Sequence, residues 1–149
     1  WFLSFKGMLT ELDLGGPVAK QKSAVPVVGA AAAKGGWRPG GYQAFAVDPS
    51  AKYAVVSMHD KGGEGTHKRP AKQLWIVELA TGKTVGKTPG LGSASLAFAR
   101  ASKRLQALDG ETGAMNVWSF NDAGKVPTLK LVANVKRAGE AALHIESGD

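Results

Sequence analysis

Four side chains of the types that bind metal ions or transfer protons lie within one stretch of nine residues. They are His59, Asp60, Glu64 and His67. The stretch is rich in glycine, its spacing matches no established ligand motif, and the chain has no cysteine that could complete a site. We therefore expect no metal here. We interpret the stretch as a structured loop between two strands that hydrogen-bonds a neighbouring subunit.

Other catalytic motifs are not found in the sequence. Residues 61–66 are rich in glycine, but the Gly-Lys-Ser/Thr ending and the helix of a phosphate-binding loop do not follow. The segment Gly92-Ser93-Ala94-Ser95 does not match the Gly-x-Ser-x-Gly turn of serine hydrolases. His144 is flanked by Glu140 and Glu146, but alternation along a terminal strand predicts that it faces solvent. We assign no catalytic, cofactor-binding or metal-binding residue to this chain.

The segment Trp37-Arg38-Pro39-Gly40-Gly41 has the composition of a recognition loop. Tryptophan and arginine are frequent anchors of protein interfaces. Proline fixes the backbone beside them, and glycine permits sharp turns. Trp37 could equally pack its own loop onto the fold, and the sequence leaves both interpretations open.

The net charge of +7 is compatible with nucleic acid, an anionic membrane or an acidic protein as a partner. The lysines are spread over the chain, and the nearest thing to a cluster is residues 67–69 with Lys72. No stripe of Lys and Arg alternates with aromatic residues, as it does in nucleic-acid-binding grooves. No apolar run approaches the ~20 residues that cross a bilayer. We expect neither a nucleic-acid nor a membrane partner.

The elements that hold these residues are predicted to be β-strands, because short apolar runs alternate with turn residues along the chain. Residues 30–34 are too few for an amphipathic helix and are followed by two glycines, so no helix is expected there. We expect strands at residues 1–5, 8–14, 42–47, 53–58, 73–79, 95–99, 104–108, 114–120, 128–135 and 141–146.

The strand pattern repeats along the chain. The phenylalanines of Ala44-Phe45-Ala46 and Ala97-Phe98-Ala99 are 53 residues apart. In contrast, Gly82 and Gly124, which lie in the later turns of the two units, are 42 residues apart. The difference arises because the loop at residues 59–72 of the first unit corresponds to a short loop at residues 109–113 of the second. Without the longer loop the period is about 42 residues, which is the length of a four-stranded propeller blade.

Residues 74–77 are apolar at every position, as in a strand buried on both faces between stacked blades. We therefore predict an all-β fold, a β-propeller fragment of about three four-stranded blades, that begins within a blade. The single domain of residues 1–149 is divided into a blade remnant at 1–14, a long insertion at 15–40, a blade at 41–90, a blade at 91–135 and a closing strand at 141–146.

Three segments carry a more specific resemblance. They are Gly36-Trp37-Arg38-Pro39-Gly40-Gly41-Tyr42-Gln43, then Met58-His59-Asp60 continuing to residues 63–68, and Leu74-Trp75-Ile76-Val77 continuing to Thr81-Gly82-Lys83. In this order and spacing the chain resembles the heavy subunit of the methylamine and aromatic amine dehydrogenases from about residue 35 onward, and more loosely at residues 1–14. The first segment with the downstream His-Lys loop is the specific part, because the Thr-Gly-Lys turn occurs in many propellers.

The resemblance implies a seven-bladed propeller that is the non-catalytic heavy subunit of a periplasmic enzyme. It implies an α2β2 assembly with a second heavy subunit and a Cys-rich light subunit that carries the tryptophan tryptophylquinone cofactor. Such an enzyme oxidises primary amines to aldehyde and ammonia and passes electrons to an amicyanin- or azurin-like blue copper protein. The sequence indicates neither which amine nor which acceptor. Trp75 and Trp118 lie in buried-strand patterns, so we expect them in the core and no quinone in this chain.

We expect the loops near Trp37 and His67 to face a partner subunit. The residues assigned to that interface are Trp37, Arg38, His59, His67, Lys68 and Arg69. The alternative function is that of another secreted β-propeller, which acts as a protein-binding or scaffold module.

Overall fold

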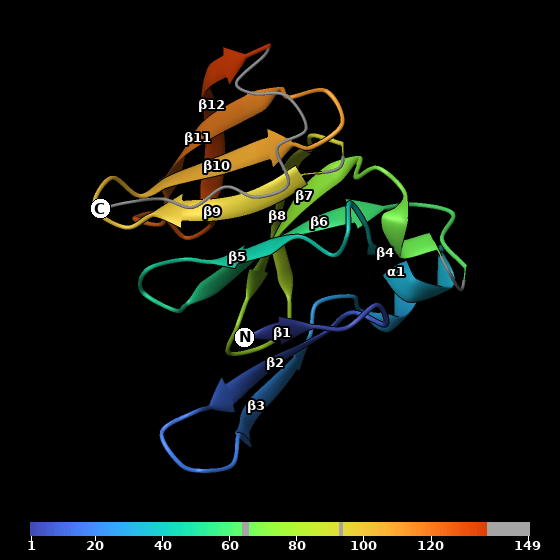
Figure 1. Cartoon of the computed structure of the whole chain (residues 1–149), viewed down its shortest axis with the longest axis vertical. Helices are drawn as coiled ribbons and strands as arrows, with labels where there is room; N and C mark the ends of the chain where they lie inside the picture. The colour runs from blue at the N-terminus through green and yellow to red at the C-terminus, as the bar shows by residue number, and fades with distance from the viewer. Residues whose placement is uncertain (64–65, 93, 137–149) are drawn as a thin grey trace.

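The computed structural model describes residues 1–63, 66–92 and 94–136, and strands make up most of the regular structure in that part of the chain (Figure 1). The first sheet contains β1 (Phe2–Leu3), β2 (Met8–Asp13) and β3 (Lys20–Pro26). The second contains β4 (Arg38–Pro39), β5 (Phe45–Val47), β6 (Tyr53–His59), β7 (Gln73–Glu78) and β8 (Thr84–Pro89). The third contains β9 (Ala94–Ala99), β10 (Arg104–Asp109), β11 (Met115–Asn121) and β12 (Thr128–Val135). Two short helices, α1 (Ala30–Lys34) and η1 (Thr66–Lys68), lie in the connections.

Every strand pair within the three sheets is antiparallel, and the third sheet runs in the order β9, β10, β11, β12. In the second sheet both β4 and β5 pair with β6, at different places along the same edge. Strand β5 of the second sheet contacts β9 of the third, so these two strands lie side by side, as the innermost strands of neighbouring propeller blades do. The all-β class and the propeller-fragment architecture predicted from the sequence are confirmed.

The segment expected as a long insertion contains a strand. Strand β3 pairs with β2 from Met8 opposite Pro26 to Asp13 opposite Lys20, so it is the last strand of the first sheet. Its sequence Lys-Gln-Lys-Ser-Ala-Val-Pro is mostly exposed and polar, and such an edge strand leaves no apolar run to be recognised. The residues that follow form α1, although no helix was expected, because four alanines favour one helical turn even at this length.

The strand expected from residue 42 begins only at Phe45. Tyr42 and Gln43 have φ angles of 63° and 62°, in the left-handed region, and this conformation cannot continue a strand. The aromatic Tyr42 favours a strand by composition, but here it belongs to a turn. The closing strand expected at residues 141–146 lies outside the described residues.

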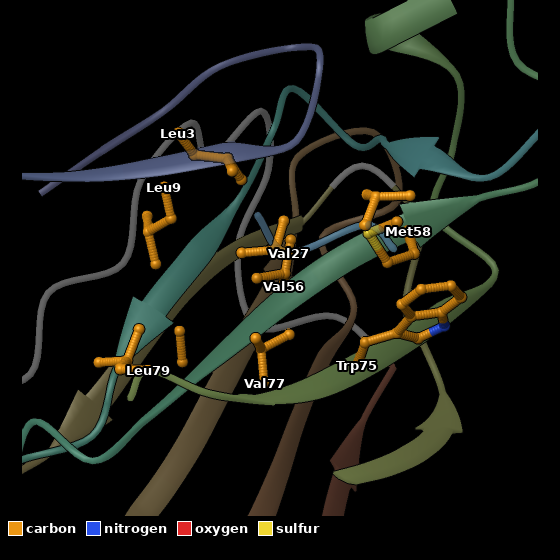
Figure 2. Packing of buried hydrophobic residues seen from close by; sticks show 10 residues of the cluster. Leu3, Leu9, Val27, Val56, Met58, Trp75, Val77 and Leu79 are labelled. Carbon is orange, nitrogen blue, oxygen red and sulfur yellow. The ribbon is translucent and has the colours of Figure 1, made fainter. Parts of the chain in front are cut away.

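Two apolar clusters hold the three sheets together, one on each face of the second sheet. In β7, Trp75 and Val77 belong to the cluster shared with the first sheet, whereas Leu74 and Ile76 belong to the cluster shared with the third. Figure 2 shows the first of these clusters. Each of these four side chains is at most 2 % exposed, so burying each of them stabilises the fold by about 1.5–3 kcal/mol. The expectation that residues 74–77 are buried on both faces is confirmed.

The third sheet adds Trp118 and Phe120 to the second cluster, with exposed fractions of 3 % and 5 %. The core positions expected for Trp75 and Trp118 are therefore confirmed. On the first sheet, Phe2 and Met8 are exposed on the face away from the cluster. Leu131 is also half exposed on β12.

Candidate functional site

Two connections meet at one end of the second sheet. The first is residues 35–44, which lead from α1 to β5, and the second is residues 60–72, which lead from β6 to β7. We call these segments the loop pair. The amide of Gly62 donates to the carbonyl of Gly36 at 2.8 Å, and the amide of Gly41 donates to the carbonyl of Arg69 at 2.7 Å. Backbone bonds therefore hold the two segments together as one surface.

Trp37 attaches the first segment to the sheet. Its ring centroid lies 5.1 Å from that of Trp75, and the side chain is half-buried against the first apolar cluster. The Lys87 ammonium lies 4.1 Å from the Trp75 ring centroid and 5.9 Å from that of Trp37, which places a cation over both rings. This geometry supports the packing role that the sequence left open for Trp37 beside an interface role.

Arg38 braces the loop from within. Its Nη1 donates to the carbonyl oxygens of Ala33 at 2.8 Å and of Trp37 at 2.7 Å. The first of these acceptors lies in the only turn of α1, whose last carbonyl groups have no partner inside the helix. The guanidinium is half-buried, so Arg38 holds α1 and the start of the loop pair in a fixed relation.

His59 lies at the centre of the loop pair and is 1 % exposed. Its Nδ1 is 2.9 Å from the carbonyl oxygen of Asp60, and its Nε2 is 3.3 Å from Oγ1 of Thr66. The imidazole ring fits between Gly40 and Gly62, where a Cβ on either residue would lie 2.5 Å from a ring carbon. His59 was expected among the interface side chains, but burial leaves it to act on a partner only through the loops that it positions.

Lys68 and Arg69 are exposed at the surface of the second segment. The amide of Arg69 donates to the carbonyl of Thr66 at 3.0 Å, and its Nη1 lies 3.5 Å from the carbonyl oxygen of Lys61. Of His67 the structure describes the backbone, which lies in η1, but not the side chain. Among the described side chains of the expected interface, Lys68 and Arg69 are therefore the two that are exposed to a partner.

Asp60 is neutralised within the loop pair. Its carboxylate forms an ion pair with the Lys72 ammonium at 2.8 Å. The hydrogen bond from Lys72 holds the pKa of Asp60 below its ordinary value of 3.8. Among the described residues no three His, Cys, Asp or Glu side chains gather as a metal site would require. Glu64, from the same stretch of the sequence, lies outside the described residues.

A cavity of about 530 Å³ lies between the first and second sheets, at the end opposite the loop pair. Lys22 and Glu11 form an ion pair at 2.8 Å on its wall. Their shared hydrogen bond lowers the pKa of Glu11 and raises that of Lys22. Tyr53 and Leu79 also line it, and because the lining residues are far apart in the sequence, no local motif marks this cavity.

Sequence reasoning missed two exposed residues of the loop pair, Tyr42 and Lys61. Both have positive φ, which the sequence does not show at a residue other than glycine. A count of charges by connection, rather than along the whole chain, would have pointed to Lys61. Within the described residues no helix is long and apolar enough to cross a membrane.

Comparison with known proteins gives one consistent result. Residues 1–138 match the family described as methylamine dehydrogenase heavy chain (MADH). The methylamine dehydrogenase heavy chain of Methylorubrum extorquens is 26 % identical over 144 residues, which cover 89 % of this chain. The chain spans about a third of the length of that relative, 35 %. Because the family match extends over nearly the whole sequence, the chain belongs to the methylamine dehydrogenase heavy chain family.

Proposed function

We propose that this chain is part of the heavy subunit of a periplasmic amine dehydrogenase and that it supports the reaction without catalysing it. The family match over residues 1–138 is the observation that carries this proposal. The architecture supports it, because three stacked antiparallel sheets that share two apolar clusters are a scaffold. The relative from Methylorubrum extorquens is about three times as long as this chain, and a protein of that length would complete the ring of blades.

The chemistry is assigned to a Cys-rich light subunit. The tryptophan tryptophylquinone of that subunit would supply the two-electron oxidation by which a primary amine and water give an aldehyde and ammonia, and a blue copper protein of the amicyanin or azurin type would accept the electrons. The residues of this chain have other tasks. Trp75 and Trp118 fill the apolar clusters, and the Nε1 of Trp75 donates to Oε1 of Gln73 at 2.8 Å. These indoles therefore stabilise the scaffold on which the light subunit and a second heavy subunit assemble as α2β2.

The test is reconstitution of the natural full-length protein. It should be produced in a bacterial periplasm with and without a Cys-rich light subunit, and the purified material assayed for dye-linked oxidation of an aliphatic and an aromatic primary amine. We expect a complex of both chains to be active and the heavy subunit alone to be inactive. A heavy subunit that folds but captures no light subunit would instead support the alternative, a secreted propeller that acts as a scaffold module.

A further inference from the structure

The positive charge of the chain is concentrated in the connections at one end of the second sheet. Residues 27–44 and 60–72 together hold six Lys and Arg against two Asp and Glu, which is more than half of the net charge of +7. Lys72 is exposed but paired with Asp60, and four further basic side chains are exposed there: Lys34, Lys61, Lys68 and Arg69. With the exposed Tyr42 we call these residues the basic surface.

The cations of the basic surface have no carboxylate partner among the described residues. Ion pairs in the described part of the chain join Lys22 to Glu11, Lys103 to Asp122 and Lys72 to Asp60. The first two lie at the opposite end of the sheets. The third uses the only described carboxylate of the loop pair, so no other described carboxylate there compensates the field of the remaining cations.

The backbone beneath the basic surface is fixed before any partner binds. The bonds between Gly62 and Gly36 and between Gly41 and Arg69 join its segments, and the buried His59 ring lies between them. Tyr42 and Lys61 adopt φ angles of 63° and 52°, a strained conformation for residues other than glycine. Such strain is retained where a loop has to present its side chains in one direction.

Tyr42 provides an apolar anchor among the cations of the basic surface. Its side chain is 61 % exposed, and it follows directly after Gly41, whose amide bonds to Arg69. Tyrosine and arginine are, with tryptophan, the residues most enriched among the side chains that dominate interface affinity. An exposed tyrosine beside unpaired cations therefore matches a protein surface that offers an apolar pocket surrounded by carboxylates.

We propose that the basic surface is the docking site for an acidic face of the light subunit. The inference rests on the proposed function for the identity of that partner and adds the place and the chemistry of its binding. Trp37, Arg38 and His59 position the surface, and Lys61, Lys68 and Arg69 make the contacts. A nucleic acid fits less well, because Tyr42 is the only exposed aromatic ring of the described loop pair, and single strands bind along rows of such rings.

Charge reversal tests the inference. In the natural full-length heavy subunit, Lys61, Lys68 and Arg69 are changed together to Glu, and association with the purified light subunit is followed by stopped-flow fluorescence. We expect association at low ionic strength to slow by roughly 10- to 100-fold, because exposed charges act mainly through steering. The deficit should shrink toward unity at about 1 M salt, where the screening length is about 3 Å.

The matched control carries the same change of charge at the opposite end of the sheets. Lys20, Lys83 and Lys125 are exposed there and are also changed to Glu. We expect this variant to associate within about twofold of the unsubstituted protein, since steering depends on charge near the contact. Equal rates for the two variants would overturn the inference and leave the proposed function intact, whereas no complex with the unsubstituted protein overturns both. If the variant with Lys61, Lys68 and Arg69 changed to Glu loses binding to a labelled DNA duplex but still associates with the light subunit at the normal rate, the basic surface binds nucleic acid and the inference is overturned.

Tyr42→Gly separates docking from folding. Glycine adopts a φ of 63° without strain, so the urea midpoint of the heavy subunit should stay the same or rise. Removal of the anchor should nevertheless speed dissociation of the complex by roughly 10- to 30-fold. A variant that keeps both its stability and its dissociation rate shows that Tyr42 is no anchor, and the inference then fails.

Discussion

The fit of His59 between two glycines leads to a sharp prediction. Replacing Gly62 by Ala places a Cβ 2.5 Å from Cε1 of His59, well inside the ~3.5–4 Å at which carbon atoms attract one another. The same Cβ would lie 3.0 Å from Cγ of Arg38 and from Oγ1 of Thr66. Gly40 limits a retreat of the buried ring, because even a Cβ at Gly40 would lie 2.5 Å from the ring carbon Cδ2.

The expected loss of stability in Gly62→Ala follows from overpacking. A methyl group forced into a filled site costs about 1–3 kcal/mol of stability, and the value for Gly62→Ala should lie in this range. The neighbouring Gly63 is the matched control, because a Cβ there meets nothing within 4 Å. Neither glycine has a positive φ, so conformational strain does not contribute to the difference. Gly63→Ala should therefore leave stability unchanged or raise it by about 0.4–1 kcal/mol through the unfolded state.

Urea unfolding of the natural full-length protein measures both variants, and a shift of the midpoint at constant slope reports stability. The His59→Ala background supplies the decisive comparison. If the ring is the obstacle, the cost of Gly62→Ala falls by about 1–3 kcal/mol when the ring is removed. Equal midpoints for Gly62→Ala and Gly63→Ala, or a cost that persists without the ring, would refute the reasoning.

Three further predictions concern the ring contact beside the loop pair and the ion pair within it. Trp75→Ala should lower the free energy of unfolding by about 3–5 kcal/mol, measured by urea denaturation, because the ring is 1 % exposed. Lys87→Met keeps the apolar stem but removes the cation, and should cost about 0.5–2 kcal/mol while it changes tryptophan fluorescence. Because Lys72 lowers the pKa of Asp60, this pair stabilises the fold above pH 3.8 and the contribution is lost as the pH falls through the lowered value. In Asp60→Asn the urea midpoint should therefore fall less steeply with acidification, and an unchanged slope contradicts the assignment.

The scaffold could be predicted from the sequence because each sheet has to meet the same packing requirement. A middle strand buried on both faces must be apolar at every position, and residues 74–77 show this without any structure. The edge strand β3 has no such constraint, since its pairing needs only backbone groups. Polar residues such as Lys20 and Lys22 are acceptable there, and the segment was interpreted as an insertion.

That two loops of this chain face a partner stays a prediction from the sequence, and the structure adds how the side chains of these loops are arranged. The sequence pointed to the loops around Trp37 and His67, because tryptophan and arginine are frequent anchors of protein interfaces. Which side chains stand outside depends on contacts between distant segments. Trp37 is held by Trp75, and His59 is enclosed by Gly40 and Gly62, which lie on opposite segments of the loop pair. No local pattern contains that information.

The loop that obscured the repeat is the same one that carries the candidate interface. Residues 59–72 lengthen one unit beyond the period of about 42. The longer connection contributes no described residue to the two apolar clusters, because none of their members lies in residues 60–72. It instead brings Lys61, Lys68 and Arg69 to one end of the sheet, where hydrogen bonds and a buried imidazole hold their backbone in place. Because strands fix the period and loops are free to depart from it, the departure is where a surface specific to this chain is expected.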